Sequence, residues 1–105
     1  MTEAMVVFVT APSAEKAAEI ARTLVEEKLA ACGNVIPGIR SIYRWEGKIC
    51  DDAEALLVLK VAAKRLQELS DRIVALHPYQ LPEVVATRIE GGNERYIDWI
   101  VQTMY

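Results

Sequence analysis

The only histidine of this 105-residue chain, His77, lies in the segment Leu-His-Pro-Tyr-Gln-Leu-Pro-Glu at residues 76–83. Imidazole is the commonest metal-binding side chain and the one that titrates near neutral pH. A histidine near a helix C-terminus also interacts well with the exposed carbonyl groups, and a following proline ordinarily ends a helix. The segment therefore has two interpretations: part of a binding site, or the place where a helix ends.

A metal site within one protomer would need further ligands, and the chain offers few. Cys32 and Cys50 are the two thiols, and neither C-x-x-C nor H-x-x-x-H spacing is present. Free cysteines are most often buried and inert, which is the favoured interpretation of both. A metal site at a subunit boundary stays open, because every chain of an oligomer supplies its own copy of each ligand.

Carboxylates and one lysine are the other candidate ligands. Four acidic side chains gather around a predicted hairpin, at Glu46, Asp51, Asp52 and Glu54. Such a group usually belongs to a solvated turn, and a weak oxygen-ligand cation site is the alternative. Lys60 is the single charge within the apolar run Leu-Leu-Val-Leu-Lys-Val. It either extends to an edge or pairs with a carboxylate, and a half-buried lysine is a candidate anion ligand.

An aromatic row precedes the acidic group. Tyr43 and Trp45 are two positions apart in a predicted strand, so both lie on one face of it. Rows of this kind near a hairpin tip more often make packing or subunit contacts than a ligand cage. A turn over Glu-Gly-Lys would place Arg40 opposite Glu54 as a cross-strand ion pair. The same register sets Tyr43 opposite Asp51.

Seven elements are expected from the apolar periodicity and the turn residues, in the order β-α-β-β-α-β-α. Strands are predicted at 5–10, 39–45, 49–61 and 84–89, and helices at 13–28, over 66–76 and after Asn93. The first six elements match the α+β, ferredoxin-like β-α-β-β-α-β sandwich, an antiparallel sheet with two helices on one face. The last is an extra C-terminal helix. By length, residues 1–105 form one domain.

The predicted strands are apolar on both faces, although the sheet face away from the helices is normally solvated. The first strand carries Val7 and Val9 on one side and Val6 and Phe8 on the other. One short C-terminal helix can cover only part of a four-stranded face, and large exposed apolar areas mark interaction surfaces. We therefore expect a homo-oligomer in which the open faces of several sheets meet. A C-terminal helix that covers the whole face is the alternative.

Composition and charge exclude several classes of partner. The net charge is −3 and neither sign forms a block, so nucleic acid and anionic membrane are poor candidates. The apolar runs are far shorter than the ~20 residues of a membrane helix. The N-terminal residues lack the basic region of a signal peptide. Two cysteines do not make a disulfide framework, so we expect a reduced, cytoplasmic protein.

Other functions of the ferredoxin-like plan are also disfavoured. The loop after the first strand, Thr-Ala-Pro-Ser-Ala-Glu-Lys-Ala, has neither the M-x-C-x-x-C motif of a copper chaperone nor the Gly-rich, arginine-bearing loop of an acylphosphatase. The strand segment 55–61 carries no aromatic residue that could stack on RNA. The spacing reveals no nucleophile–base pair and no paired catalytic carboxylates, so we expect no enzymatic activity.

Several segments together resemble the CutA divalent-cation tolerance family. They are Lys-Leu-Ala-Ala-Cys-Gly-Asn-Val-Ile-Pro-Gly at 28–38, Ser-Ile-Tyr-Arg-Trp-Glu-Gly-Lys-Ile at 41–49 with Asp52 and Glu54 after it, Lys60, residues 76–83, and Gly-Asn with Tyr-Ile-Asp-Trp-Ile within 92–100. They follow in family order and cover nearly the whole chain. The resemblance implies a ferredoxin-like protomer in a tight homotrimer, similar in assembly to the PII signalling proteins. It also implies a non-enzymatic role in tolerance of copper and other divalent cations.

The resemblance further implies a polar cleft between subunits, with residues 76–83 close to the hairpin. The residues of this predicted ligand site are Tyr43, Trp45, Glu54, Lys60, His77, Tyr79 and Glu83. His77 and Cys32 are the candidate metal ligands; no cofactor is required, and a divalent cation such as copper is the candidate. Two alternatives stay open: a PII-like regulatory module that binds a small anion in this cleft, and a trimeric assembly or stability factor for partner proteins.

Overall fold

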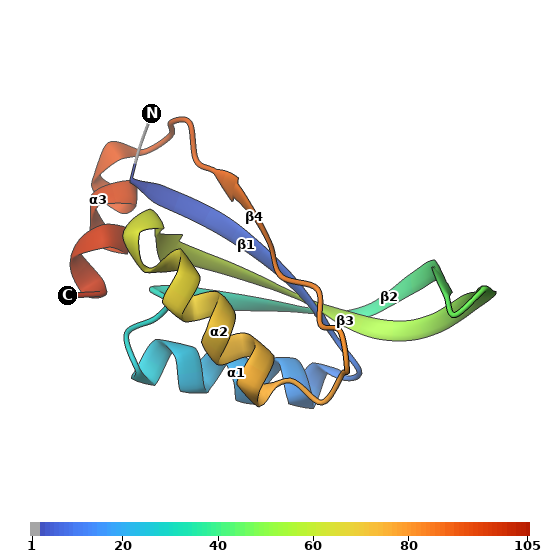
Figure 1. Cartoon of the computed structure of the whole chain (residues 1–105). Helices are drawn as coiled ribbons and strands as arrows, with labels where there is room; N and C mark the ends of the chain where they lie inside the picture. The colour runs from blue at the N-terminus through green and yellow to red at the C-terminus, as the bar shows by residue number, and fades with distance from the viewer. Residues whose placement is uncertain (1–2) are drawn as a thin grey trace.

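A single antiparallel sheet organises the chain. The computed structural model describes residues 3–105, so residues 1 and 2 of the predicted domain lie outside the described part. The elements are β1 (Ala4–Ala11), α1 (Ala14–Glu26), β2 (Cys32–Trp45), β3 (Lys48–Ala62), a short 3-10 turn η1 (Ala63–Arg65), α2 (Leu66–Leu76), β4 (Val85–Arg88) and α3 (Glu94–Thr103). The strand order is β2-β3-β1-β4, and α1 and α2 lie on the same side of the sheet (Figure 1). This confirms the predicted α+β, ferredoxin-like plan with an extra C-terminal helix.

Short polar side chains and a proline set the helix boundaries. The Ser13 hydroxyl accepts a hydrogen bond from the backbone N–H of Lys16 at the start of α1, and Asn93 caps α3 in the same way. Helix α2 ends at Leu76 because the residue before Pro78 is restricted to extended backbone. His77 accordingly has φ −80° and ψ 139°. Among residues 3–105, no helix is long and apolar enough to cross a membrane.

The core lies between the sheet and helices α1 and α2. Alternate residues of β1 and β3 point toward these helices and are fully buried, whereas most of their neighbours on the other face are only half-buried. The largest side chains of this layer are Val7, Val9, Leu57, Leu59 and Val61 from the strands and Ile20, Leu24, Leu69 and Ile73 from the helices. Each such burial stabilises the fold by about 1.5–3 kcal/mol. The layer therefore holds both helices firmly against one side of the sheet.

Helix α3 covers one end of the opposite side. Ala4 and Ala62 are neighbours in the sheet there and are fully buried. Met104, just after α3, accepts a hydrogen bond on Sδ from the Ala62 backbone N–H at 3.0 Å. At the same end, the Tyr96 hydroxyl lies 3.5 Å from Cys32 Sγ. Figure 1 shows α3 at the end of the sheet where β1 begins.

The rest of that side is uncovered within one protomer, and we call it the open face. Its side chains are Val6, Phe8, Leu56 and Val58, which are half-buried, and Ile36 and Val85, which are 45% and 55% exposed. The register confirms that they share one side, because Phe8 is opposite both Val58 and Val85. Helix α3 therefore does not cover the whole face, and the two-faced apolar pattern of the strands leaves an apolar surface.

Strand β2 begins at Cys32, seven residues before the predicted start. The sequence suggested a loop here because Gly33, Pro37 and Gly38 usually interrupt a strand. In the structure, the pairing register shifts between Ile36 and Ile39, so the proline and Gly38 form a bulge on an edge strand. Gly33 serves another purpose: a Cβ there would lie 3.0 Å from the Ala21 Cβ, which shows how closely α1 approaches the strand.

The β2–β3 hairpin extends well past the rest of the chain, and we call residues 39–54 the arm (Figure 1). Its turn contains two residues, Glu46 and Gly47, with φ 50° and 77°. Two successive positive φ angles are typical of the type I′ turn, which joins strands through two residues. Trp45 therefore pairs with Lys48, and the predicted register is wrong by one residue.

Candidate functional site

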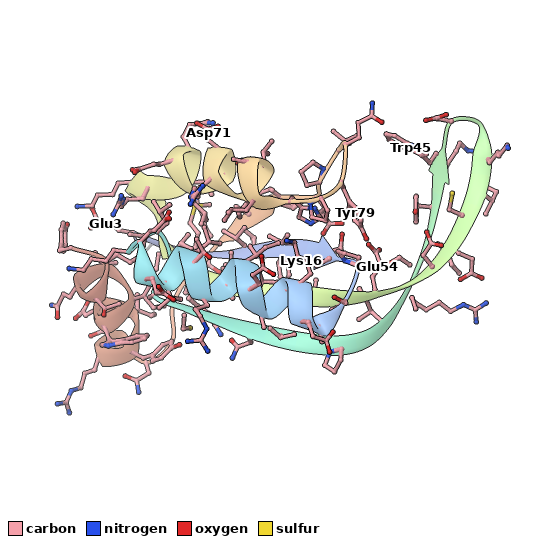
Figure 2. The ribbon with its side chains drawn as sticks, turned by 90° about the horizontal axis from the view of Figure 1, so that it is seen from below. Glu3, Lys16, Trp45, Glu54, Asp71 and Tyr79 are labelled. Carbon is pink, nitrogen blue, oxygen red and sulfur yellow. The ribbon has the colours of Figure 1, made fainter. Side chains whose placement is uncertain are left out.

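A cleft of about 950 Å³ opens where the arm leaves the body of the protein, between the arm and the loop that follows α2. Its lining residues are Thr10, Pro12, Ser41, Ile42, Tyr43, Trp45, Asp52, Ala53, Glu54, Pro78, Tyr79, Gln80, Leu81 and Glu83. Figure 2 shows Tyr79 and Glu54 close together, with Trp45 further out along the arm. Of the predicted ligand residues, Tyr43, Trp45, Glu54, Tyr79 and Glu83 line this cleft, and Lys60 and His77 do not.

The inner end of the cleft is formed by a hydrogen bond between the loop and the sheet. The Tyr79 hydroxyl donates to Glu54 Oε2 at 2.7 Å. Burial, and then the hydrogen bond to the Glu54 carboxylate, raises the pKa of Tyr79. The phenol therefore keeps its proton at neutral pH and acts as a donor, and it orients the carboxylate that faces the cleft.

A second pair of the same kind lies on the arm. The Tyr43 hydroxyl donates to Asp52 Oδ2 across the hairpin. This hydrogen bond is the main cause that raises the pKa of Tyr43 to about 12. Within residues 3–105, no hydrogen bond engages the second oxygen of either Asp52 or Glu54. Each carboxylate thus retains one oxygen that can accept a bond from a ligand.

The turn length decides which acidic residues reach the cleft. Because Trp45 pairs with Lys48, Tyr43 is opposite Cys50 and shares its face with Asp52. The predicted register placed Tyr43 opposite Asp51 and Arg40 opposite Glu54, and both predictions are wrong. A one-residue shift moves every side chain of a strand to the other face.

The arm's other face carries a separate ion pair. Arg40 donates from Nε and Nη2 to the two oxygens of Asp51, at 2.8 and 2.7 Å. The guanidinium lowers the pKa of Asp51, and the carboxylate in turn raises the pKa of Arg40. Asp51 and Arg40 are therefore engaged with each other, away from the cleft. Asp52 is the acidic cleft residue that the predicted ligand site omitted, although the sequence had indicated it within the acidic group around the hairpin.

His77 is buried behind the cleft and holds the loop in place. Its Nε2 lies 2.7 Å from the carbonyl oxygen of Thr10, and its Nδ1 accepts a hydrogen bond from the Tyr79 backbone N–H at 3.2 Å. A backbone N–H can only donate and a carbonyl can only accept, so Nε2 carries the proton. The imidazole ring also packs against the Tyr79 ring, with centroids 4.6 Å apart. Both ring nitrogens are thus used inside the protomer, and His77 positions Tyr79.

Lys60 and Cys32 lie elsewhere on the sheet. They are opposite each other in the register, on the side that α3 partly covers. Six residues of β3 separate Lys60 from Glu54, which is about 20 Å along a strand. Lys60 Nζ donates to the side-chain oxygen of Asn34. Cys32 and Cys50 are both half-buried, so the expectation that the thiols belong to the buried core is wrong.

Comparison with known proteins settles the family. Residues 5–103 match the model of the CutA1 divalent ion tolerance protein family. The chain belongs to the CutA1 family. A divalent-cation tolerance protein CutA of Thermus thermophilus is 50% identical over 95 residues, covering 90% of this chain and 92% of that protein. Human protein CutA is 46% identical over 95 residues, covering 90% of this chain and 53% of that protein, so the chain spans about half of the human relative.

Solved CutA1 structures share the fold. The CutA1 protein of Thermus thermophilus has a TM-score of 0.92 at 48% identity, covering 95% of this chain and 97% of that one. A PII-like CutA protein of a Nostoc species has a TM-score of 0.89 at 37% identity, covering 96% and 97%.

The name of the CutA1 family refers to divalent ions, but one protomer does not bring a set of metal ligands together. Within residues 3–105, no group of three or more His, Cys, Asp or Glu side chains is placed to hold a metal ion. The candidate ligands His77 and Cys32 do not converge. His77 contacts Thr10, which pairs with Leu56, whereas Cys32 pairs with Lys60 four residues along β3. The residues of a single CutA1 chain here therefore do not fit a metal centre.

Proposed function

We propose that the chain is a homotrimeric, non-enzymatic binding protein that acts in divalent-cation tolerance in the cytoplasm. The single observation that supports assembly is the apolar open face. Exposed contiguous apolar patches beyond a few hundred Å² are uncommon on monomers and mark contact surfaces. Phe8, Val58 and Val85 are opposite one another at its centre, so the patch is continuous across three strands.

The arm supplies a second apolar surface. Ile42 and Ile49 are 66% and 64% exposed, and both lie on the arm face opposite to that of Tyr43 and Asp52, although Ile42 also reaches the rim of the cleft. An isolated two-stranded ribbon is marginally stable in water, yet this arm reaches well beyond the helices (Figure 1). A second copy of the chain that packs against it would bury these isoleucines. Closed cyclic symmetry is the usual arrangement for identical chains.

The charge of the cleft favours a cation over the small anion of the alternative hypothesis. Asp52, Glu54 and Glu83 all line it, and among residues 3–105 no lysine or arginine side chain does. An anion in this position would meet only like charges. A metal ion such as copper would have to be held by ligands from more than one protomer, because one chain does not assemble them.

The oligomeric state is measured by size-exclusion chromatography with light scattering. We expect three copies of the 11.7 kDa chain, a mass of about 35 kDa. Phe8→Glu should lower the mass toward that of one chain because it buries a charge in the contact. Val74→Glu, on the outer face of α2, is the matched control and should keep the trimer mass. A native mass of 11.7 kDa at micromolar concentration would refute the assembly.

The tolerance role is tested by growth on graded copper(II) chloride. A copper-sensitive host that expresses the chain should grow at higher copper concentrations than the host alone. The Phe8→Glu variant, expressed to the same level, should not restore growth. Equal growth of all three strains would refute a role in tolerance while leaving the assembly intact.

A further inference from the structure

We propose that the cleft between the arm and the loop after α2 binds an organic ammonium ion, with its charged head at Asp52 and Glu54. The inference rests on the proposed function as a binding protein and names the ligand class of its cleft. It differs from both a bare metal ion and an anion, and three properties of the lining residues lead to it.

The first property is uncompensated negative charge. Asp52 and Glu54 are two positions apart in β3, so both lie on the same face of the strand. Each already accepts one hydrogen bond from a tyrosine hydroxyl. Those bonds orient the carboxylates without neutralising them. Among the cations of the arm, Arg40 is paired with Asp51 on the other face, and neither Arg44 nor Lys48 lines the cleft. A ligand that supplies N–H donors and positive charge would satisfy the remaining oxygens.

The second property is the aromatic wall. Tyr43, Trp45 and Tyr79 line the same cleft as the carboxylates. Aromatic faces attract alkylammonium groups through the ring quadrupole. A bare divalent cation would instead require about six oxygen ligands in close contact, and the described residues include no group of three or more suitable side chains. The wall therefore selects an organic cation over a metal ion.

The third property is size combined with apolar lining. The cleft volume of about 950 Å³ is in the range of sites that hold small organic molecules, which are mostly apolar with a few placed polar groups. Pro12, Ile42 and Leu81 provide apolar surface beside the acidic end. A ligand with an ammonium head and a short hydrocarbon body matches this division.

The test is isothermal titration calorimetry on the full chain with ligands of matched length. The probes are 1,4-diaminobutane and butanedioate, which share a four-carbon frame and carry opposite charge, and magnesium chloride. We expect heat of binding for the diamine alone. Asp52→Asn and Glu54→Gln, which keep side-chain shape and remove charge, should each weaken diamine binding at least about fivefold, since hydrogen bonds to charged groups are the stronger class. Trp45→Leu should weaken it as well.

The control is Asp71→Asn, an acidic residue on α2 that lies away from the cleft (Figure 2). It removes the same charge from the chain and should leave the diamine affinity unchanged. Butanedioate binding, magnesium binding without diamine binding, or an equal loss in Asp71→Asn would overturn the inference. Light scattering on the same samples separates the two proposals: a 35 kDa species that binds no diamine refutes the ligand class only, and a monomer that binds it refutes the assembly only.

Discussion

The Tyr79 hydroxyl lies 2.7 Å from Glu54 Oε2, although the two residues are 25 positions apart. This bond ties the loop after α2 to β3 at the base of the arm. Together with the bond from His77 Nε2 to the Thr10 carbonyl, it attaches the loop to the sheet at two points, and the bond from the Tyr79 N–H to His77 Nδ1 links those two points within the loop. The cleft therefore has a fixed inner wall in the isolated protomer.

Tyr79→Phe should reduce the free energy of unfolding by about 1 kcal/mol, the usual net contribution of one hydrogen bond. The ring remains to pack on His77, so the loop should keep its place. Urea denaturation followed by circular dichroism measures the change. Tyr105→Phe removes a hydroxyl from a ring that contacts Lys64 through its face, and it should leave stability unchanged. Equal stability of Tyr79→Phe and the native chain would contradict the role assigned to this bond.

The ionisation of Tyr43 reports on its bond to Asp52. The pKa of Tyr43 is raised to about 12, above the usual tyrosine value of 10.0, so the folded state retains this proton where the unfolded state loses it. The associated stability is present below pH 10 and declines as the pH rises through 12. Ultraviolet titration near 295 nm should show one late-titrating tyrosine fewer in Asp52→Asn than in the native chain, because Tyr43 moves toward 10 while Tyr79 still titrates late. A native chain whose tyrosines all titrate near 10 would count against the bond.

The hairpin turn is strained at its first residue. Glu46 adopts φ 50° without being glycine, and asparagine followed by glycine is the preferred pair in a type I′ turn. Glu46→Asn should therefore raise the free energy of unfolding by a few tenths to about 1 kcal/mol, whereas Gly47→Ala should lower it by about 1 kcal/mol. Thermal unfolding of both variants gives the comparison. A rise in the free energy of unfolding for Glu46→Asn and a fall for Gly47→Ala would support the two-residue turn. An unchanged free energy of unfolding for Gly47→Ala would contradict it.

Gly33 allows α1 to approach β2. A Cβ at this position would lie 3.0 Å from the Ala21 Cβ and 3.1 Å from Leu59 Cδ2, both in the core. Gly33→Ala should therefore destabilise the fold by about 1–3 kcal/mol, as overpacking does. Gly91→Ala, where an added Cβ meets no atom within 4 Å, is the matched control in the same denaturation assay. Similar stabilities of the two variants would show that α1 can move aside.

Much of the fold follows from local sequence. Ser13 and Asn93 mark the starts of α1 and α3, because their side chains accept hydrogen bonds from the backbone N–H groups of the first helical turn. Pro78 ends α2 through a clash with its own neighbour. Apolar residues occupy both the odd and the even positions of β1, which predicts a strand that is apolar on both faces whatever its partner strands are. Element order and the existence of an apolar open face are therefore readable from the chain alone.

The residues of the cleft are brought together by contacts between distant parts of the chain, which local sequence does not specify. One residue more or less in the turn decides whether Asp51 or Asp52 joins Tyr43, because strand pairing alternates faces at every position. His77 was a plausible ligand by type, but its contact with Thr10, 67 positions away, commits the ring to holding the loop. Local sequence specified which elements form and which residues alternate along each strand. Only the tertiary pairing decided which side chains of different strands share a surface, because that depends on the register between the strands.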